Sequence, residues 1–290
     1  MKPTIMRKPA VLIVDEVHPM VVPGLEALGY ECIPCQARSK DEIGAIIPNA
    51  TGIIIRHRFK LDAEFLSEAT DLHWIGRSGV GLDAVDLECC RNKGIEVLNA
   101  AGGNAAAVGE HVIGMILSLL NHLNRADEQV RQGHWNREAN RGKELGSLTV
   151  GIIGHGHTGR ALAQRLSGFG CNMIAYDKYD EVSGPYAKKS SLEGIYREAD
   201  IVTFHVPSTE ETYHYFDTRF LEQMRNPFYL INVSRGPVTD ISAIVKGLRT
   251  NKILGVGLDV LENEPKDEGV LSVDNDDLSY LLDSDKVIFS

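Results

Sequence analysis

Residues 149–160, Thr-Val-Gly-Ile-Ile-Gly-His-Gly-His-Thr-Gly-Arg, are a short apolar segment that runs into a Gly-x-Gly-x-x-Gly turn. Apolar residues at helical spacing follow, so the pattern predicts a strand, a turn and a helix. We expect Gly154 to permit the tight reversal, Gly156 to let a pyrophosphate approach the backbone, and Gly159 to let the helix pack on the strand. The helix would present its unpaired N–H groups to the anion.

The next apolar segment, residues 172–176, ends in Asp177. An acidic residue about 20 residues beyond the turn completes the dinucleotide fingerprint, because its carboxylate accepts both ribose hydroxyls. The same carboxylate would repel a 2′-phosphate, so the sequence favours NAD over NADP. Two alternatives remain: a structural glycine turn in an unrelated α/β sheet, and an enzyme of this architecture that binds S-adenosylmethionine.

The composition of the 290 residues, 43% apolar and 24% charged, is ordinary for a globular protein and predicts about two domains. A formal net charge of −10 argues against nucleic acid or an anionic membrane as a partner. No apolar run reaches the roughly 18 residues of a membrane span, and no signal peptide is recognisable, so we expect a cytoplasmic protein. The five cysteines are not spaced for zinc, and we expect no metal. Cys32 and Cys35 have redox-motif spacing but are expected to be structural.

Strand and helix patterns alternate in residues 1–100, which predicts a parallel sheet covered on both faces. The expected strands are 11–14, 30–33, 52–55, 73–76 and 95–98, and the expected helices are 20–28, 40–47, 61–69 and 84–91. A second α/β unit follows, with strands expected at 149–153, 172–176, 201–204, 228–233, 253–258 and 287–289.

Residues 104–132 are predicted to form one long helix that is apolar on most of its circumference. A helix of this kind is buried on nearly every side. A domain interface together with a subunit interface would bury it, and a central position within one chain is the alternative.

Two of the later strands end in residues suited to chemistry. Arg235 follows the strand 228–233, while Asp259 and Glu264 follow the strand 253–258. Ligands collect at the carboxyl ends of parallel strands, so we expect an arginine and carboxylates around the nicotinamide. An arginine offers a bidentate fork to the carboxylate of a 2-keto acid.

From about residue 10 to Ser290 the chain resembles the D-isomer-specific 2-hydroxyacid dehydrogenases, in the branch that includes the D-3-phosphoglycerate dehydrogenases. The motifs that carry the resemblance are Gly-Arg-Ser-Gly-Val-Gly-Leu-Asp-Ala-Val-Asp at 76–86, Asn-Ala-Ala-Gly-Gly-Asn at 99–104, the glycine turn, His-Val-Pro at 205–207, Ile-Asn-Val-Ser-Arg-Gly at 231–236, and Leu-Asp-Val at 258–260 with Glu264-Pro265. The resemblance implies two doubly wound parallel-sheet domains. These are a flavodoxin-like substrate domain at 1–100 and a Rossmann NAD-binding domain at 101–290, with a homodimer built through the helix 104–132.

The resemblance also implies roles for individual residues. Arg235 would bind the substrate carboxylate and carbonyl oxygen, and Glu264 would orient the catalytic histidine and raise its pKa. Asp259 would lie near the nicotinamide carboxamide. The substrate-binding candidates are Arg56, Arg77 and the backbone N–H groups of Ser78, Gly79, Val80 and Gly81. The cofactor-binding candidates are Gly154, His155, Gly156, His157, Thr158, Gly159, Asp177, His205, Val206, Pro207, Val233, Ser234 and Asp259.

The family's catalytic histidine follows the last strand and would fall two positions beyond Ser290. The segment that returns to complete the first domain is also absent. We therefore expect the sequence to be truncated, so that this polypeptide binds NAD but turns over poorly. None of the histidines at 155, 157 and 205 is expected to replace the missing one.

The substrate implied by the resemblance is a D-2-hydroxy acid that exchanges hydride with NAD and becomes the 2-keto acid. Arg56 and Arg77, together with His57, Arg58 and Lys60, favour a phosphorylated substrate. The first expectation is therefore D-3-phosphoglycerate, which is oxidised to phosphohydroxypyruvate in serine biosynthesis. The alternatives are a glyoxylate, hydroxypyruvate or D-lactate-type reductase, and a non-catalytic NAD-sensing protein like the corepressor relatives of the family.

Overall fold

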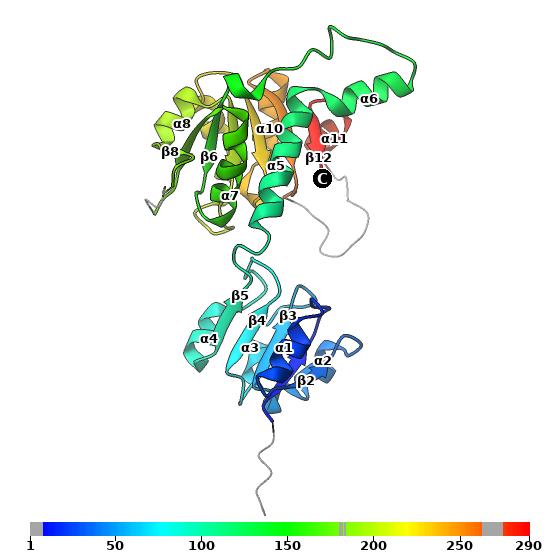
Figure 1. Ribbon diagram of the computed structural model, residues 1–290, viewed down its shortest axis with the longest axis vertical. Coiled ribbons are helices and arrows are strands. Elements are labelled where there is room, and N and C mark those ends of the chain that lie inside the picture. The colour runs from blue at the N-terminus through cyan, green and yellow to red at the C-terminus, as the bar shows by residue number, and fades with distance from the viewer. Residues whose placement is uncertain (1–7, 180–181, 183, 263–274) are drawn as a thin grey trace, which may run out of the picture. The chain divides into compact units, whose positions relative to one another are not determined.

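The computed structural model describes residues 8–179, 182, 184–262 and 275–290. The chain divides into two compact units, one ending at Asn104 and the other comprising Ala105–Ser290. Each unit has its own sheet (Figure 1). The division falls a few residues beyond the predicted boundary, after the run of small residues at 99–103.

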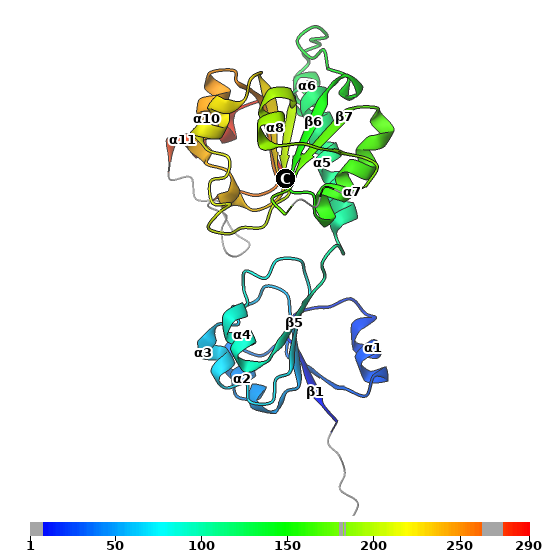
Figure 2. The ribbon, with the colours of Figure 1, turned by 90° about the vertical axis from the view of Figure 1, so that its left-hand side faces the viewer.

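The first unit is a five-stranded sheet in the order β2-β1-β3-β4-β5, and every neighbouring pair is parallel. Its strands are β1 Ala10–Ile13, β2 Glu31–Pro34, β3 Gly52–Ile55, β4 Trp74–Arg77 and β5 Glu96–Asn99. Its helices are α1 Val21–Ala27, α2 Lys40–Gly44, α3 Ala63–Ser67 and α4 Leu87–Lys93, with a 3₁₀ turn at Ile47–Asn49. In Figure 2, α1 covers one face of the sheet and the other three helices cover the opposite face. This is the flavodoxin-like order, as predicted.

Side-chain caps fix where three of the four α-helices of the first unit begin, namely α2, α3 and α4. Ser39 accepts a hydrogen bond from the N–H of Glu42, whose carboxylate accepts one from the N–H of Ser39 in return. Asp62 and Asp86 cap α3 and α4 by accepting one hydrogen bond each, from the N–H groups of Phe65 and Cys89, without a reciprocal bond. Gly94 ends α4 with a φ of 70°, which a residue with a Cβ adopts only at a cost.

The second unit is a seven-stranded parallel sheet in the order β12-β11-β10-β9-β6-β7-β8. Its strands are β6 Thr149–Ile153, β7 Asn172–Tyr176, β8 Lys188–Lys189, β9 Ile201–Phe204, β10 Phe228–Asn232, β11 Ile253–Leu258 and β12 Val287–Phe289. The six predicted strands are present, and β8 was not predicted. The chain leaves β6 for β7 on one side and returns to β9 on the other, so the crevice of this Rossmann sheet lies at the carboxyl ends of β6 and β9.

Helices cover both faces of the second sheet (Figure 2). Residues of α5 (Ala105–Leu120) and α7 (His157–Leu166) share one hydrophobic core. Residues of α8 (Leu192–Glu198), α9 (Thr218–Gln223), α10 (Ile241–Arg249) and α11 (Asp276–Asp283) share the other. Three 3₁₀ turns lie at Leu145–Ser147, Ser167–Phe169 and Gly236–Val238. The α5 and α7 backbones approach closely at Gly109, where an added Cβ would lie 3.1 Å from the Leu162 nitrogen.

The prediction of a single helix at 104–132 is wrong. The structure has α5 and a separate α6 (Leu123–Arg131), bent by 58° at the break. His122 lies at the break in the left-handed conformation, with φ 53° and ψ 36°, and this ends the α-helical hydrogen-bond pattern. The apolar part of the predicted helix is α5, which carries all the buried residues of the pair, whereas α6 has a polar sequence and no buried residue. In the described part of the chain no single helix is long and apolar enough to span a membrane, although α5 and α6 would pass that test as a bent pair.

Candidate functional site

The glycine turn joins β6 to α7 at the switch point of the second sheet, and its glycines have different surroundings. Gly154 has φ +90°, and an added Cβ would lie 2.4 Å from the His205 carbonyl oxygen. At Gly159 the added Cβ would lie 2.2 Å from the Gly154 carbonyl oxygen. At Gly156 it would meet nothing within 4 Å. Two glycines are thus required by packing, while the third keeps space open beside the backbone.

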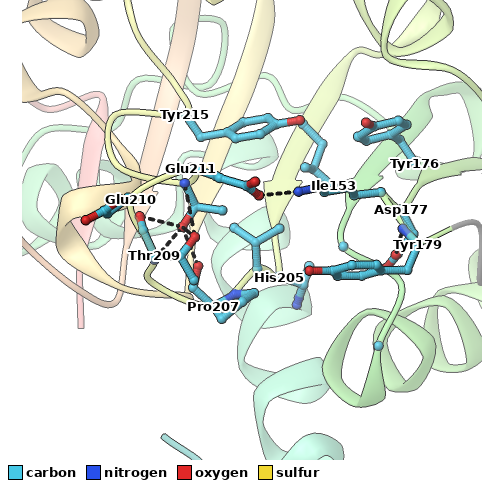
Figure 3. A pocket seen from close by; sticks show the side chains of 15 residues that line it. Ile153, Tyr176, Asp177, Tyr179, His205, Pro207, Thr209, Glu210, Glu211 and Tyr215 are labelled. Atoms are coloured by element: carbon cyan, nitrogen blue, oxygen red, sulfur yellow. Dashed lines mark hydrogen bonds and ion pairs between the residues drawn. The ribbon is translucent and has the colours of Figure 1, made fainter. Parts of the chain in front are cut away.

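That space belongs to a pocket of about 760 Å³ at the carboxyl ends of β6, β7 and β9 (Figure 3). Six of the predicted cofactor residues line it: Gly154, Gly156, Asp177, His205, Val206 and Pro207. Three tyrosines also face it, Tyr176, Tyr179 and Tyr215. Aromatic walls next to a glycine turn and a helix N-terminus fit an adenine nucleotide, whose base is flat and apolar and whose phosphates are anionic.

Asp177 ends the second strand of the fingerprint, and its carboxylate is held by backbone groups. One oxygen accepts a hydrogen bond from the His155 N–H at 2.8 Å, and the other accepts one from the Tyr179 N–H at 2.9 Å. These bonds fix the carboxylate at the pocket wall. Each oxygen keeps a further lone pair that can accept from a ribose hydroxyl.

His205 follows β9 and is part-buried at the wall of the pocket. Its Nδ1 lies 3.2 Å from the Thr158 hydroxyl and its Nε2 lies 3.0 Å from the Thr203 hydroxyl. Desolvation, with a smaller repulsion from His155, lowers the pKa of His205 to about 3. The imidazole is therefore neutral at physiological pH and too weak a base to collect the proton of an alcohol.

The lowered pKa of His205 predicts a pH-dependent stability. The unfolded state binds a proton at this residue below an ordinary pKa of about 6.5, while the folded state does not until about pH 3, so stability falls as pH decreases through this window. Between pH 7.5 and pH 5.0 we expect the protein to lose about 2 kcal/mol more unfolding free energy than His205→Gln. Urea unfolding of both proteins at the two pH values measures this difference. Equal losses would show that His205 titrates normally.

The segment after β10 is held by a chain of buried polar groups. The Asn232 side-chain amide donates to the Arg235 carbonyl oxygen at 3.0 Å and to the Thr239 hydroxyl at 3.1 Å. Its oxygen accepts from the Ser234 N–H at 3.0 Å, and the Ser234 hydroxyl donates to the Phe204 carbonyl oxygen at 2.7 Å. This network ties the tip of β10 to β9 and fixes the backbone from which Arg235 projects.

The Arg235 side chain is exposed at the carboxyl end of the sheet, and its Nη1 donates to the Ser234 carbonyl oxygen at 2.7 Å. The following residue, Gly236, packs against the segment after β11. An added Cβ there would lie 1.8 Å from the Leu261 carbonyl oxygen. The arginine segment and the carboxylate-bearing segment are therefore in direct backbone contact.

Asp259 follows β11 and takes part in a small polar cluster. Its carboxylate accepts a hydrogen bond from the Ser290 hydroxyl at 2.7 Å and lies 3.3 Å from Nε2 of His111, on α5. The Ser290 hydroxyl is also 2.5 Å from that nitrogen. The predicted acid Glu264 lies outside the described residues. Its neighbour Glu262 forms a 2.6 Å ion pair with His214.

In the first unit, the loop after β4 contains the predicted carboxylate-binding N–H groups. Two of these are already donors, Ser78 to the Ile55 carbonyl at 2.9 Å and Gly79 to the Arg77 carbonyl at 2.8 Å. For Val80 and Gly81, no acceptor is found among the residues that the structure describes. The N–H groups of Val80 and Gly81 are therefore the ones still available to a ligand, and carboxylate binding by this loop stays a prediction.

The predicted substrate arginines lie at the carboxyl-terminal end of the first sheet. Ile55 of β3 pairs in register with Arg77 of β4, and Arg56 follows Ile55 directly, so both arginines lie at carboxyl ends of neighbouring strands. The Arg77 guanidinium covers Gly79, where an added Cβ would lie 1.3 Å from Nη1.

Arg58, which added to the expected positive charge, has a structural role instead. Its guanidinium donates to the carbonyl oxygens of Val14, Cys35 and Arg38, and so joins the segments after β1 and β2. The case for a phosphate-binding edge therefore depends on Arg56 and Arg77.

Other predicted cofactor residues lie near the pocket without lining it. His155 is buried, and with His157 it lines a separate hollow of about 310 Å³ beside α7. The Thr158 hydroxyl contacts His205, and Ser234 accepts from the Val206 N–H at 3.1 Å. Val233 packs against the core shared by α5 and α7.

Several residues that build the site were not predicted, namely Thr203, Asn232, Thr239, Tyr176, Tyr215, Lys178 and Glu211. In the described part of the chain no group of three or more histidine, cysteine or acidic side chains could hold a metal ion. All five cysteines are free thiols.

Comparison with known proteins agrees with this geometry. Residues 113–289 match the family described as D-isomer specific 2-hydroxyacid dehydrogenase, NAD binding domain. The hydroxypyruvate reductase of Thermotoga maritima is 34% identical over 240 residues, which are 81% of this chain and 78% of that protein. The D-3-phosphoglycerate dehydrogenase of Archaeoglobus fulgidus is 31% identical over 91% of this chain, which spans about half (51%) of that longer enzyme. The structure of D-lactate dehydrogenase from Aquifex aeolicus, complexed with NAD and lactic acid, has a TM-score of 0.78 at 29% identity and covers 97% of this chain and 87% of that one.

Proposed function

Because the chain belongs to the D-isomer specific 2-hydroxyacid dehydrogenase family, whose NAD-binding domain it contains, we propose that the protein interconverts a D-2-hydroxy acid and its 2-keto acid. The observation that carries the proposal is Arg235, exposed at the tip of β10 and fixed there by Asn232, in the same sheet as the dinucleotide pocket. A guanidinium in this position can bind a carboxylate and polarise a carbonyl oxygen.

The residues of this chain would divide the work as follows. The glycine turn and Asp177 would bind the pyrophosphate and the adenine ribose, and Asp259 would orient the nicotinamide carboxamide. NAD supplies the hydride acceptor when bound. Arg235 would hold the keto acid and stabilise the charge that develops on its oxygen. With a pKa of about 3, His205 is not the proton carrier of this reaction. The role of Glu264 stays a prediction from the resemblance.

For the substrate, we propose D-3-phosphoglycerate, with phosphohydroxypyruvate as its keto acid, and hence a place in serine biosynthesis. Two observations support a phosphorylated substrate: the two arginines at neighbouring strand ends, Arg56 and Arg77, and the similarity to D-3-phosphoglycerate dehydrogenases. Hydroxypyruvate is the second candidate. It is favoured by the larger share of the relative that the match covers, 78% of the T. maritima hydroxypyruvate reductase against 51% of the A. fulgidus enzyme. The structural role of Arg58 favours it too, because it leaves less positive charge for a phosphate.

We further propose a cytoplasmic homodimer in which α5 and α6 form the subunit contact. The exposed side of α5 includes small residues such as Ala107 and Gly114, which allow close approach of a second helix. Leu123, Val130 and Trp135, on and after α6, are half-exposed or more and would add apolar area to such a contact. The non-catalytic alternative is less well supported, because such a protein has no need of an ordered Arg235.

A panel of 2-keto acids, assayed by NADH oxidation with the full-length protein, tests the proposal. We expect phosphohydroxypyruvate to be reduced with a kcat/KM at least roughly tenfold above that of hydroxypyruvate, glyoxylate or pyruvate, because loss of one charged contact costs about 1.5–3 kcal/mol. A higher value for hydroxypyruvate would support the second candidate. If NADH binds but none of the keto acids is reduced, the non-catalytic alternative gains.

A further inference from the structure

The dinucleotide pocket has an ion pair at its mouth that the cofactor assignment does not explain. Lys178 follows Asp177 directly at the end of β7, and Glu211 lies in the segment between β9 and α9. Their charged groups are in contact although they are 33 residues apart in sequence, and both residues line the pocket. Glu211 is labelled in Figure 3. The pair therefore joins two walls of the pocket beside the carboxylate expected to bind the adenine ribose.

The position of Lys178 bears on which dinucleotide the pocket accepts. A lysine next to the ribose-binding acid is well placed to bind a 2′-phosphate, the group that distinguishes NADP from NAD. Here the ammonium is engaged by Glu211, and the hydrogen bond between them raises the pKa of Lys178. The ammonium also lies 5.7 Å from the centre of the Tyr179 ring. In this structure the ammonium is therefore paired with a carboxylate and lies beside an aromatic ring.

The remaining charges around the pocket act in the same direction. Its lining includes three carboxylates, those of Asp177, Glu210 and Glu211. On the described lining the ammonium of Lys178 is the one cation, because His205 is neutral. A 2′-phosphate would add a dianion to a net negative mouth. Loss of Glu211 would remove one negative charge and also release a positive one.

We propose that Glu211 is a second determinant of the preference for NAD over NADP, and that it acts by keeping Lys178 from a 2′-phosphate. Asp177 excludes the phosphate by its own charge, whereas Glu211 excludes it by engaging the cation that would bind it. The two determinants lie on different segments, Asp177 at the end of β7 and Glu211 in the loop between β9 and α9. The preference for NAD would thus have two causes: Asp177 repels the 2′-phosphate, and the ion pair with Glu211 keeps Lys178 from binding it.

Fluorescence titration of the protein with NAD and with NADP tests this proposal without reference to any substrate. We expect Glu211→Gln to raise the affinity for NADP relative to NAD by roughly fivefold, since each exposed charge contact contributes modestly. The double variant Glu211→Gln/Lys178→Met should lose that gain, because the released ammonium is its source. The gain should also shrink between about 50 mM and about 500 mM salt, as expected of exposed charges.

The matched control is Glu210→Gln, which removes a neighbouring carboxylate of the same pocket lining. It changes the net charge equally but leaves Lys178 paired with Glu211. We expect its NADP/NAD affinity ratio to stay within roughly twofold of the parent value. The proposal is overturned if both glutamine variants raise the ratio equally, or if the double variant keeps the gain. Glu211 is an exposed side chain, and equal melting temperatures of the variants would exclude altered folding.

Discussion

Replacement of Arg235 by alanine is expected to lower kcat/KM for reduction of the 2-keto acid by roughly three orders of magnitude, the upper range for loss of one transition-state donor. The guanidinium is exposed at the carboxyl end of β10, while its backbone is held by the Asn232 amide. Truncation of the side chain therefore removes the donor without disturbing the network beneath it. Steady-state kinetics of the full-length protein measure the loss, and NADH titration should give an unchanged dissociation constant.

Arg235→Lys is the matched control for this experiment. It keeps the positive charge but replaces a planar fork with a single ammonium. We expect it to recover part of the lost activity and to remain roughly tenfold or more below the parent protein. If Arg235→Ala weakens NADH binding as much as it lowers kcat/KM, the arginine binds the cofactor and has no special role toward the keto acid.

The architecture was predictable because hydrophobic periodicity is local. Apolar segments bounded by glycine and polar residues gave the parallel strands of both sheets, with ends shifted by a residue or two, as for β1 at Ala10–Ile13 against the predicted 11–14. The two-residue strand β8 contains only Lys188 and Lys189 and has no such pattern. It forms by pairing with β7, and this tertiary contact cannot be predicted from the local sequence.

The break between α5 and α6 could not be predicted from the local pattern of apolar residues. Neither Asn121 nor His122 is a strong helix breaker, so the apolar positions before them and the helix-forming residues after them predict one helix. In the structure the backbone turns at His122, and the Asn121 amide donates to the Leu117 carbonyl oxygen at 3.0 Å. A single left-handed residue bends the chain by 58°, and nothing in the composition of the segment indicates it.

Residues of the candidate site could be predicted where the residue type itself indicates a chemical role. Glycines at fixed spacing and an acid after the second strand indicated the cofactor site, and an arginine after a later strand indicated the substrate site. Asn232 gave no such signal, because it lies within an otherwise apolar strand whose interior polar residues are hard to interpret alone. Glu211 gave no signal either, because its partner Lys178 is 33 residues away in the sequence and only the fold brings the two together.

Gly156→Ala should separate the binding role of the glycine turn from its folding role. The added methyl would meet no protein atom within 4 Å, so we expect the melting temperature to stay close to that of the parent protein. The methyl would, however, point into the space through which a pyrophosphate reaches the backbone N–H groups. Loss of one such charge-assisted hydrogen bond predicts NAD binding weaker by roughly tenfold to a hundredfold.

Gly168→Ala is the control for this prediction, because Gly168 is exposed in the same unit and its added Cβ also meets nothing within 4 Å. Its dissociation constant for NAD should equal that of the parent protein. Gly154→Ala should instead lower the melting temperature, since φ +90° and a 2.4 Å approach to the His205 carbonyl oppose any side chain. If Gly156→Ala binds NAD as tightly as Gly168→Ala does, the diphosphate does not lie against this turn. Gly154 and Gly159 would then serve only to pack the turn and α7 against the sheet.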